Sequence, residues 1–283
     1  MSLSLLVTGA TGFTGRRAVR ELLGRGHRVA AFVRASSDRA TLPPEVEVVA
    51  GDLDRPATLE AALRGRDALV NVASLGFGHA PGIVAAARAA GIGRAVFVGT
   101  TAVRTTLPAA SKAVRLAAEQ AVLGGGIGAT LLRPTMIYGA PGDRNLERLL
   151  RFVRRCPIIP VPGGGHGLQQ PVHVGDVAAA IAAVTPRGDL AGRAYDVAGP
   201  TPMTFRELLG TVVAVLGRRR LLVDVPAFFA RVVATREQLA RLAEDKSCDV
   251  LEAARAFGHA PRPFARGIRE EAIALGLARE EPS

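Results

Sequence analysis

Three glycines at regular spacing constrain the fold of this chain more than any other feature of its sequence. Gly9, Gly12 and Gly15 stand in the segment TGATGFTG, directly after the apolar run Leu3–Thr8 and at the start of an amphipathic segment over Thr14–Leu23. Glycines at such a junction allow a tight turn, and they let the N–H groups of a helix N-terminus approach an anion, which the helix dipole favours. The spacing therefore predicts a strand, an anion-binding turn and a helix as the first unit of a parallel α/β domain.

The rest of the first two-thirds of the chain repeats this strand and helix rhythm, which is typical of a parallel sheet covered on both faces. Strands are predicted over Leu3–Thr8, Arg28–Val33, Glu45–Val49, Ala68–Val72, Ala95–Gly99 and Thr130–Leu132. Helices are predicted over Thr14–Leu23, Ala57–Leu63, Gly82–Ala90 and Ala109–Leu123. Runs such as VAAFV do not alternate, because strands inside a parallel sheet are buried on both faces. The predicted fold class is α/β, a doubly wound parallel (Rossmann) sheet.

The rhythm is lost after Arg133, where Pro/Gly-rich loops such as CPIIPVPGGGHG interleave with helices. We expect residues 1–133 to form a nucleotide-binding domain, and residues 134–283 to form a smaller C-terminal lobe that binds the substrate and sends segments back to the first domain. Within this lobe, Thr204 and Glu207 have the spacing of a capping box and predict a helix start.

Composition excludes several other classes of protein. The net charge of +11 comes almost entirely from arginines spread along the chain, so we expect no nucleic-acid binding, and the dense run Arg218–Arg220 reads as a turn before a strand. Cys156 and Cys248 lie far apart without a His/Cys cluster, which predicts neither a disulfide nor a metal site and favours a cytoplasmic setting. No run approaches the roughly 20 apolar residues of a membrane-spanning helix, so no membrane insertion is expected.

The glycine turn predicts where a dinucleotide would lie. Its pyrophosphate would contact the three glycines together with Thr11, Phe13 and Thr14. The second strand ends in Val33-Arg34, where an NAD site would need an acidic residue to accept hydrogen bonds from the ribose diol. Because a guanidinium suits a 2′-phosphate instead, Arg34 with Ser36 predicts NADP as the cofactor, and Arg16 is a further candidate for the same phosphate.

Two other strand ends fit the same ligand path. Asp52 and Leu53 follow the third strand, where the carboxylate can meet the adenine amino group, and Ala73 and Ser74 follow the fourth, toward the nicotinamide. Open α/β sheets bind ligands at the carboxyl ends of their strands.

These motifs, with SK at 111–112, LLRPTMIYG at 131–139 and PVHVGDVAAAI at 171–181, resemble the short-chain dehydrogenase/reductase superfamily. The likeness is to its extended and atypical branches, which include nucleotide-sugar epimerases, NmrA-like proteins and an accessory subunit of respiratory complex I. The resemblance covers almost the whole chain. It implies a nicotinamide cofactor and, from the segment that follows the sixth strand, places Pro134 and Tyr138 beside the cofactor and substrate cleft.

The chain departs from this family at the catalytic motif. Catalytic members carry a Tyr-xxx-Lys motif after the fifth strand, in which the tyrosine exchanges the substrate proton and the lysine holds the nicotinamide ribose. The matching segment here places Lys112 at the lysine and Pro108 at the tyrosine, so the usual acid is absent from its usual place. Thr100 and Thr101 match the position that orients a substrate carbonyl, and Tyr138 is a candidate replacement acid.

Three functions follow as hypotheses. The leading one is an NADP(H)-dependent oxidoreductase acting on a small carbonyl or enone-like substrate, with the proton delivered by Lys112, Tyr138 or water. A second is a sensor or assembly protein that binds NADP without turnover, which the missing tyrosine favours. A third is a nucleotide-sugar epimerase or dehydratase, which depends on the tyrosine that is absent. A homodimer is left open.

Overall fold

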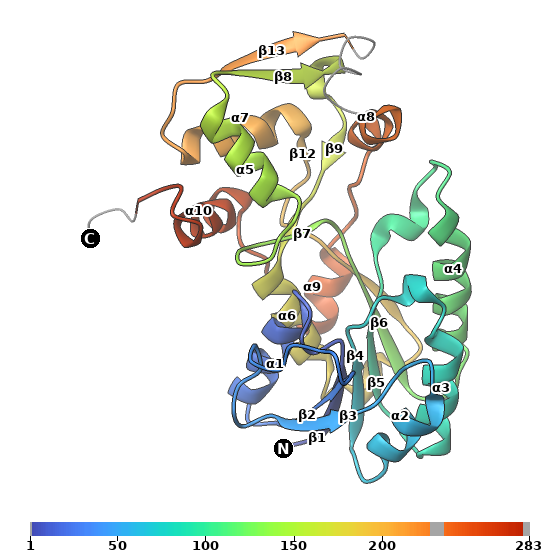
Figure 1. Cartoon of the computed structure of the whole chain (residues 1–283). Helices are drawn as coiled ribbons and strands as arrows, with labels where there is room; N and C mark the ends of the chain where they lie inside the picture. Colours follow the sequence, from blue (N-terminus) through green and yellow to red (C-terminus); the bar gives the residue numbers. More distant parts are fainter. Residues whose placement is uncertain (1, 227–234, 280–283) are drawn as a thin grey trace.

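The core of the first domain is a parallel sheet of seven strands in the order β11-β6-β5-β4-β1-β2-β3 (Figure 1). We describe it from a computed structural model that covers residues 2–226 and 235–279. The strands are β1 (Ser4–Thr8), β2 (Arg28–Val33), β3 (Glu47–Ala50), β4 (Ala68–Asn71), β5 (Ala95–Val98), β6 (Ala129–Pro134) and β11 (Ala194–Val197). The chain reverses its direction of winding between β1 and β4, and ligands bind at such a switch point.

Six of these strands confirm the sequence prediction to within two residues at each end, and the predicted α/β class is confirmed. Every residue of β1, β4 and β5 is buried, which accounts for their lack of alternation. The seventh strand, β11, was missed. It pairs with β6 at the edge of the sheet, and its short sequence AYDV gives no strong periodic signal.

Helices cover both faces of the sheet (Figure 1). One face packs against α1 (Gly15–Gly24), α6 (Val174–Val184) and α9 (Leu251–Phe257), whose apolar residues share a buried cluster with the strands. The other face packs against α2 (Pro56–Leu63), α3 (Ala80–Ala89) and α4 (Ala110–Leu123). Short 3₁₀ turns, η1 (Leu75–Phe77) and η2 (Thr101–Arg104), follow β4 and β5 directly and bend the chain along the upper edge of the sheet.

A second lobe stands on the carboxyl edge of the sheet and has its own buried cluster. Its helices are α5 (Leu146–Arg155), α7 (Phe205–Val215), α8 (Arg236–Ala243) and α10 (Phe264–Ala274). Its two-stranded sheets pair β7 (Ile137–Tyr138) with β10 (Val172–His173), β9 (Leu168–Gln169) with β12 (Met203–Thr204), and β8 (Ile158–Pro162) with β13 (Leu221–Val225). The 3₁₀ turn η3 (Gly163–Gly165) follows β8 in this lobe, and η4 (Gly188–Leu190) joins α6 to β11 in the first domain.

The chain passes between the two bodies several times. After building α5 and β8 it returns to the sheet for α6 and β11, enters the second lobe again for α7 and β13, and comes back once more for α9. The capping box at Thr204 and Glu207 is confirmed, because the threonine side chain accepts from the Glu207 N–H and the glutamate accepts from the Thr204 N–H at 2.7 Å. In the part of the chain that the structure describes, no helix is long and apolar enough to cross a membrane.

Candidate active site

The three glycines at the turn between β1 and α1 have different structural roles. Gly9 has a φ of +67°, and a Cβ there would lie 2.7 Å from the backbone nitrogen of Ala73 at the end of β4. A Cβ on Gly15 would lie 2.0 Å from the Gly9 carbonyl oxygen. At Gly12 a Cβ would meet only that same oxygen, at 3.2 Å. Gly9 and Gly15 are therefore required for packing, whereas Gly12 leaves the surface above the helix N-terminus open to a ligand.

A buried hydrogen-bond chain fixes this turn against β4. The Thr8 hydroxyl donates to the Asn71 side-chain oxygen at 2.6 Å, and the Asn71 amide donates to the Ala73 carbonyl at 3.0 Å. Both side chains are fully buried. They hold the ends of the two neighbouring strands at the switch point together, so that the glycine turn and Ala73 come into contact. The sequence analysis missed this pair, since nothing in a single sequence links Thr8 to Asn71.

The residues expected at the adenosine end lie at the ends of β2 and β3. Arg34 is exposed, and among the described residues its guanidinium has no hydrogen-bond or ion-pair partner. Ser36 is also exposed and lies in the turn closed by the Ser37 N–H, which donates to the Arg34 carbonyl at 3.0 Å. The Asp52 carboxylate accepts from the Asp54 N–H at 3.1 Å. Leu53 packs against the core. Arg34 is thus available to an incoming phosphate.

Arg16 does not join Arg34. Its guanidinium donates to the Pro141 carbonyl, and that of Arg17 donates to the Ala140 carbonyl. Both acceptors lie in the loop between β7 and α5, so the two arginines tie the start of α1 to the second lobe. Phe13 lies under the same loop, 3.3 Å from the position of a Cβ on Gly142. This loop covers one side of the glycine turn.

A cavity of about 740 Å³ opens at the carboxyl ends of β4, β5 and β6, between the two bodies of the protein. Its floor includes Thr14 on the glycine turn, Ser74 after β4, and Thr100 and Thr101 after β5, all of which the sequence analysis selected. Its other walls come from the loop 105–109, the start of β7, and residues 241 and 244–247 at and after the end of α8. A space of this size holds a drug-sized molecule or part of a dinucleotide with a substrate.

The two threonines differ in whether the hydrogen of the hydroxyl group is already used in a hydrogen bond. The Thr100 hydroxyl accepts from the Ala102 N–H at 3.2 Å, so its hydrogen remains free to donate. The Thr101 hydroxyl donates to the Pro134 carbonyl at 3.4 Å, which uses that hydrogen. Of these two threonines, Thr100 is the one whose hydroxyl hydrogen is free to bond a carbonyl in the cavity.

Pro108 lines the cavity where the family motif has its tyrosine. Lys112 lies four residues later, in the first turn of α4. It does not line the cavity, because its ammonium donates to the Thr105 carbonyl at 2.6 Å. This bond closes the loop before α4. In this structure Lys112 therefore supports the cavity wall without pointing at its contents.

Tyr138 is not brought to the cavity. It is 1% exposed, and its ring packs edge-on against His173 and Phe264, with 5.3 Å between ring centroids in each pair. Burial raises the pKa of its phenol well above the usual range. His173 has a structural role as well: its Nδ1 accepts from the Gly175 N–H at 3.1 Å, and burial lowers its pKa to about 4. The proton-donor role expected for Tyr138 therefore has no support from its position.

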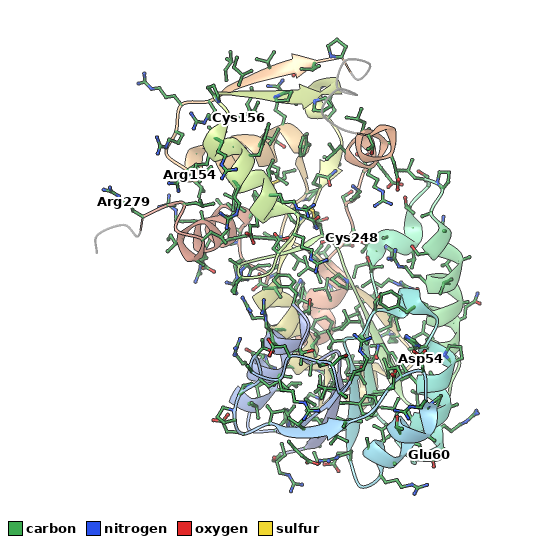
Figure 2. The ribbon with its side chains drawn as sticks, viewed as in Figure 1. Asp54, Glu60, Arg154, Cys156, Cys248 and Arg279 are labelled. Atoms are coloured by element: carbon green, nitrogen blue, oxygen red, sulfur yellow. The ribbon has the colours of Figure 1, made fainter. Side chains whose placement is uncertain are left out.

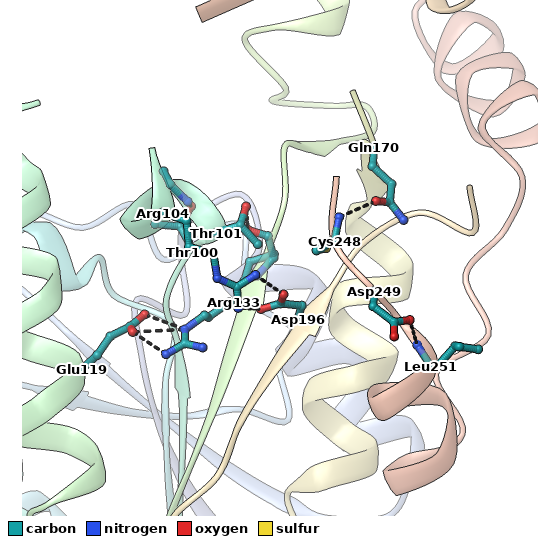
Figure 3. A network of polar contacts seen from close by, with 12 residues as sticks. Thr100, Thr101, Arg104, Glu119, Arg133, Gln170, Asp196, Cys248, Asp249 and Leu251 are labelled. Atoms are coloured by element: carbon teal, nitrogen blue, oxygen red, sulfur yellow. Dashed lines mark hydrogen bonds and ion pairs between the residues drawn. The ribbon is translucent and has the colours of Figure 1, made fainter. Parts of the chain in front are cut away.

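A polar network holds the floor of the cavity (Figure 3). Glu119 on α4 accepts three hydrogen bonds from Arg133 on β6, at 2.7 to 3.1 Å. Arg104 in η2 makes a two-pronged pair with Asp196 on β11, one contact being 2.9 Å, and this pairing raises the pKa of the guanidinium. Such bidentate pairs fix geometry as well as charge. The turn that carries Thr100 and Thr101 is therefore anchored to β11 through Arg104 and to β6 through the Thr101 hydroxyl.

The second lobe adds charged groups that the sequence analysis did not select. Glu244 accepts from the Thr105 and Thr106 hydroxyls and from the Thr106 N–H, at 2.7 to 3.0 Å. Burial alone would raise the pKa of this carboxyl, but these bonds lower it overall. Lys246 also lines the cavity, and its ammonium donates to the Arg241 carbonyl. Burial lowers the pKa of this ammonium, and the nearby Glu244 carboxylate offsets only part of that effect. Both lysines of this arginine-rich chain, Lys112 and Lys246, thus stand at or beside the cavity.

The two cysteines lie apart, with Cys156 in the second lobe and Cys248 near the junction of the two bodies (Figure 2). Burial, then the charge of Asp196, raises the pKa of the Cys248 thiol to about 12, which makes it a poor nucleophile. Among the described residues there is no group of three or more potential His, Cys, Asp or Glu ligands that could hold a metal ion.

Fold and site together define a protein built to hold a dinucleotide, and comparison with known proteins agrees. Residues 9–151 match a family model described as NAD(P)H-binding. The 2-alkyl-3-oxoalkanoate reductase of Stenotrophomonas maltophilia is 31% identical over 265 residues, covering 77% of each chain. The chain therefore belongs to the extended or atypical branch of the short-chain dehydrogenase/reductase superfamily.

Other relatives carry different activities in their names. The ceramide reductase of Caulobacter vibrioides is 36% identical over 194 residues, which is 62% of this chain and 59% of that protein. A mitochondrial NADH dehydrogenase [ubiquinone] 1 alpha subcomplex subunit 9 of Arabidopsis thaliana is 31% identical over 226 residues, or 71% of this chain and 55% of the subunit. A solved nucleoside-diphosphate-sugar epimerase from Pseudomonas aeruginosa has a TM-score of 0.80 over 99% of this chain and 100% of its own, at 18% identity. That last likeness shows the shared fold alone.

Proposed function

We propose that the protein is an NADP(H)-dependent oxidoreductase that reduces the carbonyl of a small-molecule substrate held in the cavity. The observation that carries the proposal is the cavity itself, because its lining runs from Thr14 on the glycine turn to Thr100, whose hydroxyl hydrogen is free, and to Lys246. Reductases among the relatives support this class of reaction.

The choice of NADP over NAD rests on the end of β2. Arg34 and Ser36 are exposed there, and no acidic residue stands at the strand end to accept bonds from a ribose diol. A guanidinium with no partner among the described residues fits a 2′-phosphate, with which it forms charge-assisted hydrogen bonds. Gly12 leaves open the approach to the helix N-terminus that a pyrophosphate needs.

When bound, the reduced nicotinamide supplies a hydride to the carbonyl carbon. The protein must then hold the carbonyl oxygen and deliver a proton to it. Thr100 is placed to donate a hydrogen bond to that oxygen. Lys246 is the group we assign to proton delivery, because its lowered pKa brings an ammonium closer to the range in which it can act as an acid. Lys112 supports the wall of the cavity through its hydrogen bond to the Thr105 carbonyl.

The test is NADPH consumption against a panel of ketones, aldehydes and enones. We expect turnover with at least one member, and a preference for NADPH over NADH. Thr100→Val and Thr101→Val form a matched pair, since each removes one hydroxyl from the same turn. Thr100→Val should lower kcat/KM by about tenfold or more, the value of one hydrogen bond to a polarised oxygen, while Thr101→Val should change it much less. Equal effects of the two variants would contradict the assignment.

A second candidate is a nucleotide-binding protein without turnover, and a specific observation favours it. Pro108 stands at the position of the family's tyrosine, and the Lys112 ammonium is occupied by the Thr105 carbonyl. The likeness to a named subunit of NADH dehydrogenase agrees with this candidate. Tight NADPH binding with no consumption across the whole panel would decide in its favour. The cytoplasmic setting and the homodimer stay predictions.

A further inference from the structure

The outermost sheet of the second lobe presents an uncovered apolar face. In the pair β8–β13, Leu221 lies opposite Ile158, Val223 opposite Pro160, and Val225 opposite Pro162. All six of these residues point to the same side of the sheet, because alternate residues of a strand share a face. Ile158 is 56% exposed, Leu221 61% and Val223 36%. We call this set of six residues the outer face.

The outer face is not part of the protein's core. The alternate residues Ile159 and Val161 are 1% and 0% exposed and belong to the buried cluster of the second lobe. In Figure 1, β8 and β13 lie at the end of the molecule farthest from β1, with α5 and α7 on their inner side. No described element lies over the outer face. An ordinary solvated strand would carry polar residues at these positions.

The starts of both strands are strongly cationic. Arg154 and Arg155 end α5 just before β8, and Arg218 and Arg219 precede β13, and all four are exposed. Arg220 is engaged internally, because it donates to the Val153 and Arg154 carbonyls at 2.8 and 2.6 Å. Neither of the ranges 148–162 and 208–223 contains an Asp or Glu. The arginine run noticed in the sequence is therefore one half of a cluster that the fold completes.

A small hollow of about 280 Å³ lies within this cluster. It is lined by Arg151, Arg154 and Arg155 from α5, with Gly276 and Leu277 after α10. Figure 2 shows Arg154, Cys156 and Arg279 on the same side of the second lobe. Arg151 also pairs with Glu147 at 2.9 Å, and Arg154 donates to the Gly276 carbonyl at 3.1 Å, so each keeps part of its guanidinium for a further acceptor. Among the described residues Arg155 has no hydrogen-bond or ion-pair partner. Guanidinium groups bind phosphate in a forked geometry, so this hollow suits a phosphate-bearing headgroup.

We propose that the outer face and its arginine cluster dock the protein on the surface of an anionic lipid bilayer. Aliphatic side chains on a flat face enter the boundary between headgroups and acyl chains, while arginines at its edge contact lipid phosphates. Nucleic acid would use the arginines alone and leave the apolar residues without a role. The proposal concerns attachment at the surface, and it is independent of whether the cavity turns over a substrate.

The experiment is flotation of the full chain with vesicles of phosphatidylglycerol and phosphatidylcholine, and with phosphatidylcholine vesicles alone. We expect binding to the anionic vesicles and little to the neutral ones. Leu221→Glu with Val223→Glu removes the apolar contact, and Arg155→Glu with Arg218→Glu reverses charge in the cluster while leaving the internally bonded Arg220 in place. The arginine pair should weaken vesicle binding by about 30-fold or more, since each cationic side chain near such a surface contributes about fivefold. The Leu221/Val223 pair should weaken it by a similar factor, because it replaces two buried aliphatic contacts by charges.

The matched control reverses the charge of two exposed arginines in the first domain, Arg28→Glu with Arg88→Glu. This variant has the same net charge as the Arg155/Arg218 variant. It should bind vesicles like the wild type. Circular dichroism and NADPH affinity establish that each variant is folded. Absence of vesicle binding, equal binding to neutral vesicles, or unchanged binding of the Leu221/Val223 variant would overturn the proposal. So would a dimer in solution that this variant dissociates, or a duplex DNA complex in place of vesicle binding.

Discussion

Replacing Gly12 by valine should separate nucleotide binding from folding. Gly12 does not have a positive φ, and a Cβ there meets only the Gly9 carbonyl oxygen at 3.2 Å. The turn can absorb that contact by a shift of a few tenths of an ångström, so we expect the free energy of unfolding to fall by no more than about 1 kcal/mol. The branched side chain would nevertheless stand in the open space through which a pyrophosphate reaches the helix N-terminus.

The loss of affinity can be worked from the contacts that would be blocked. A hydrogen bond to a charged group contributes about 1.5–3 kcal/mol, so displacement of the pyrophosphate from even two N–H groups costs roughly 3 kcal/mol or more. That corresponds to about a 100-fold weaker Kd. NADPH fluorescence on titration gives the affinity, and urea unfolding followed by circular dichroism gives the stability. The chain has no tryptophan to interfere with the fluorescence.

Gly15→Ala is the matched comparison, and it should lose stability as well as nucleotide binding. Its Cβ would lie 2.0 Å from the Gly9 carbonyl oxygen and 2.8 Å from the Gly9 carbonyl carbon, both backbone atoms that cannot rotate away. We expect a loss of stability of several kcal/mol, with nucleotide binding lost because the turn itself is displaced. If Gly12→Val binds NADPH as tightly as the wild type while remaining folded, the turn does not hold the pyrophosphate and the reasoning is refuted.

Three further predictions concern charge. Arg34→Ala should reduce a preference for NADP over NAD of at least about tenfold to near equality, measured as the ratio of two Kd values; equal affinities in the wild type would remove the argument. If Lys246 delivers the proton, kcat should fall as the pH rises through the lowered pKa of its ammonium. Lys246→Met should lower kcat and remove this fall from the dependence of kcat on pH. A dependence that is the same in the variant as in the wild type would exclude the role. Glu271 on α10 is 1% exposed, and burial beside the Asp143 carboxyl raises its pKa to about 8. The folded state therefore binds this proton more tightly than the unfolded state does, so stability should decline as the pH rises from about 5 to 8, and Glu271→Gln should flatten the decline in urea unfolding.

Much of the first domain follows from local sequence. The glycine spacing specifies the first turn, because only glycine tolerates the positive φ at position 9 and the close approach at position 15. Apolar runs without alternation predict strands buried on both faces, and the helix beginning after Thr204 follows from a capping box that spans four residues. Each of these signals lies within a short stretch of chain, where spacing alone fixes which groups meet.

The contents of the cavity depend instead on distant segments. Lys246 and Glu244 reach it only because the chain returns from the second lobe more than a hundred residues after Thr100 and Thr105. Tyr138 lies next to the sixth strand in sequence, yet packing against Phe264 and His173 buries it away from the cavity. The sequence by itself determined the fold class and the dinucleotide turn, because their residues are neighbours along the chain. Only the tertiary structure decided which charged groups line the cavity and which apolar residues of β8 and β13 stay uncovered, because the exposure of a side chain depends on what packs against it from elsewhere in the chain.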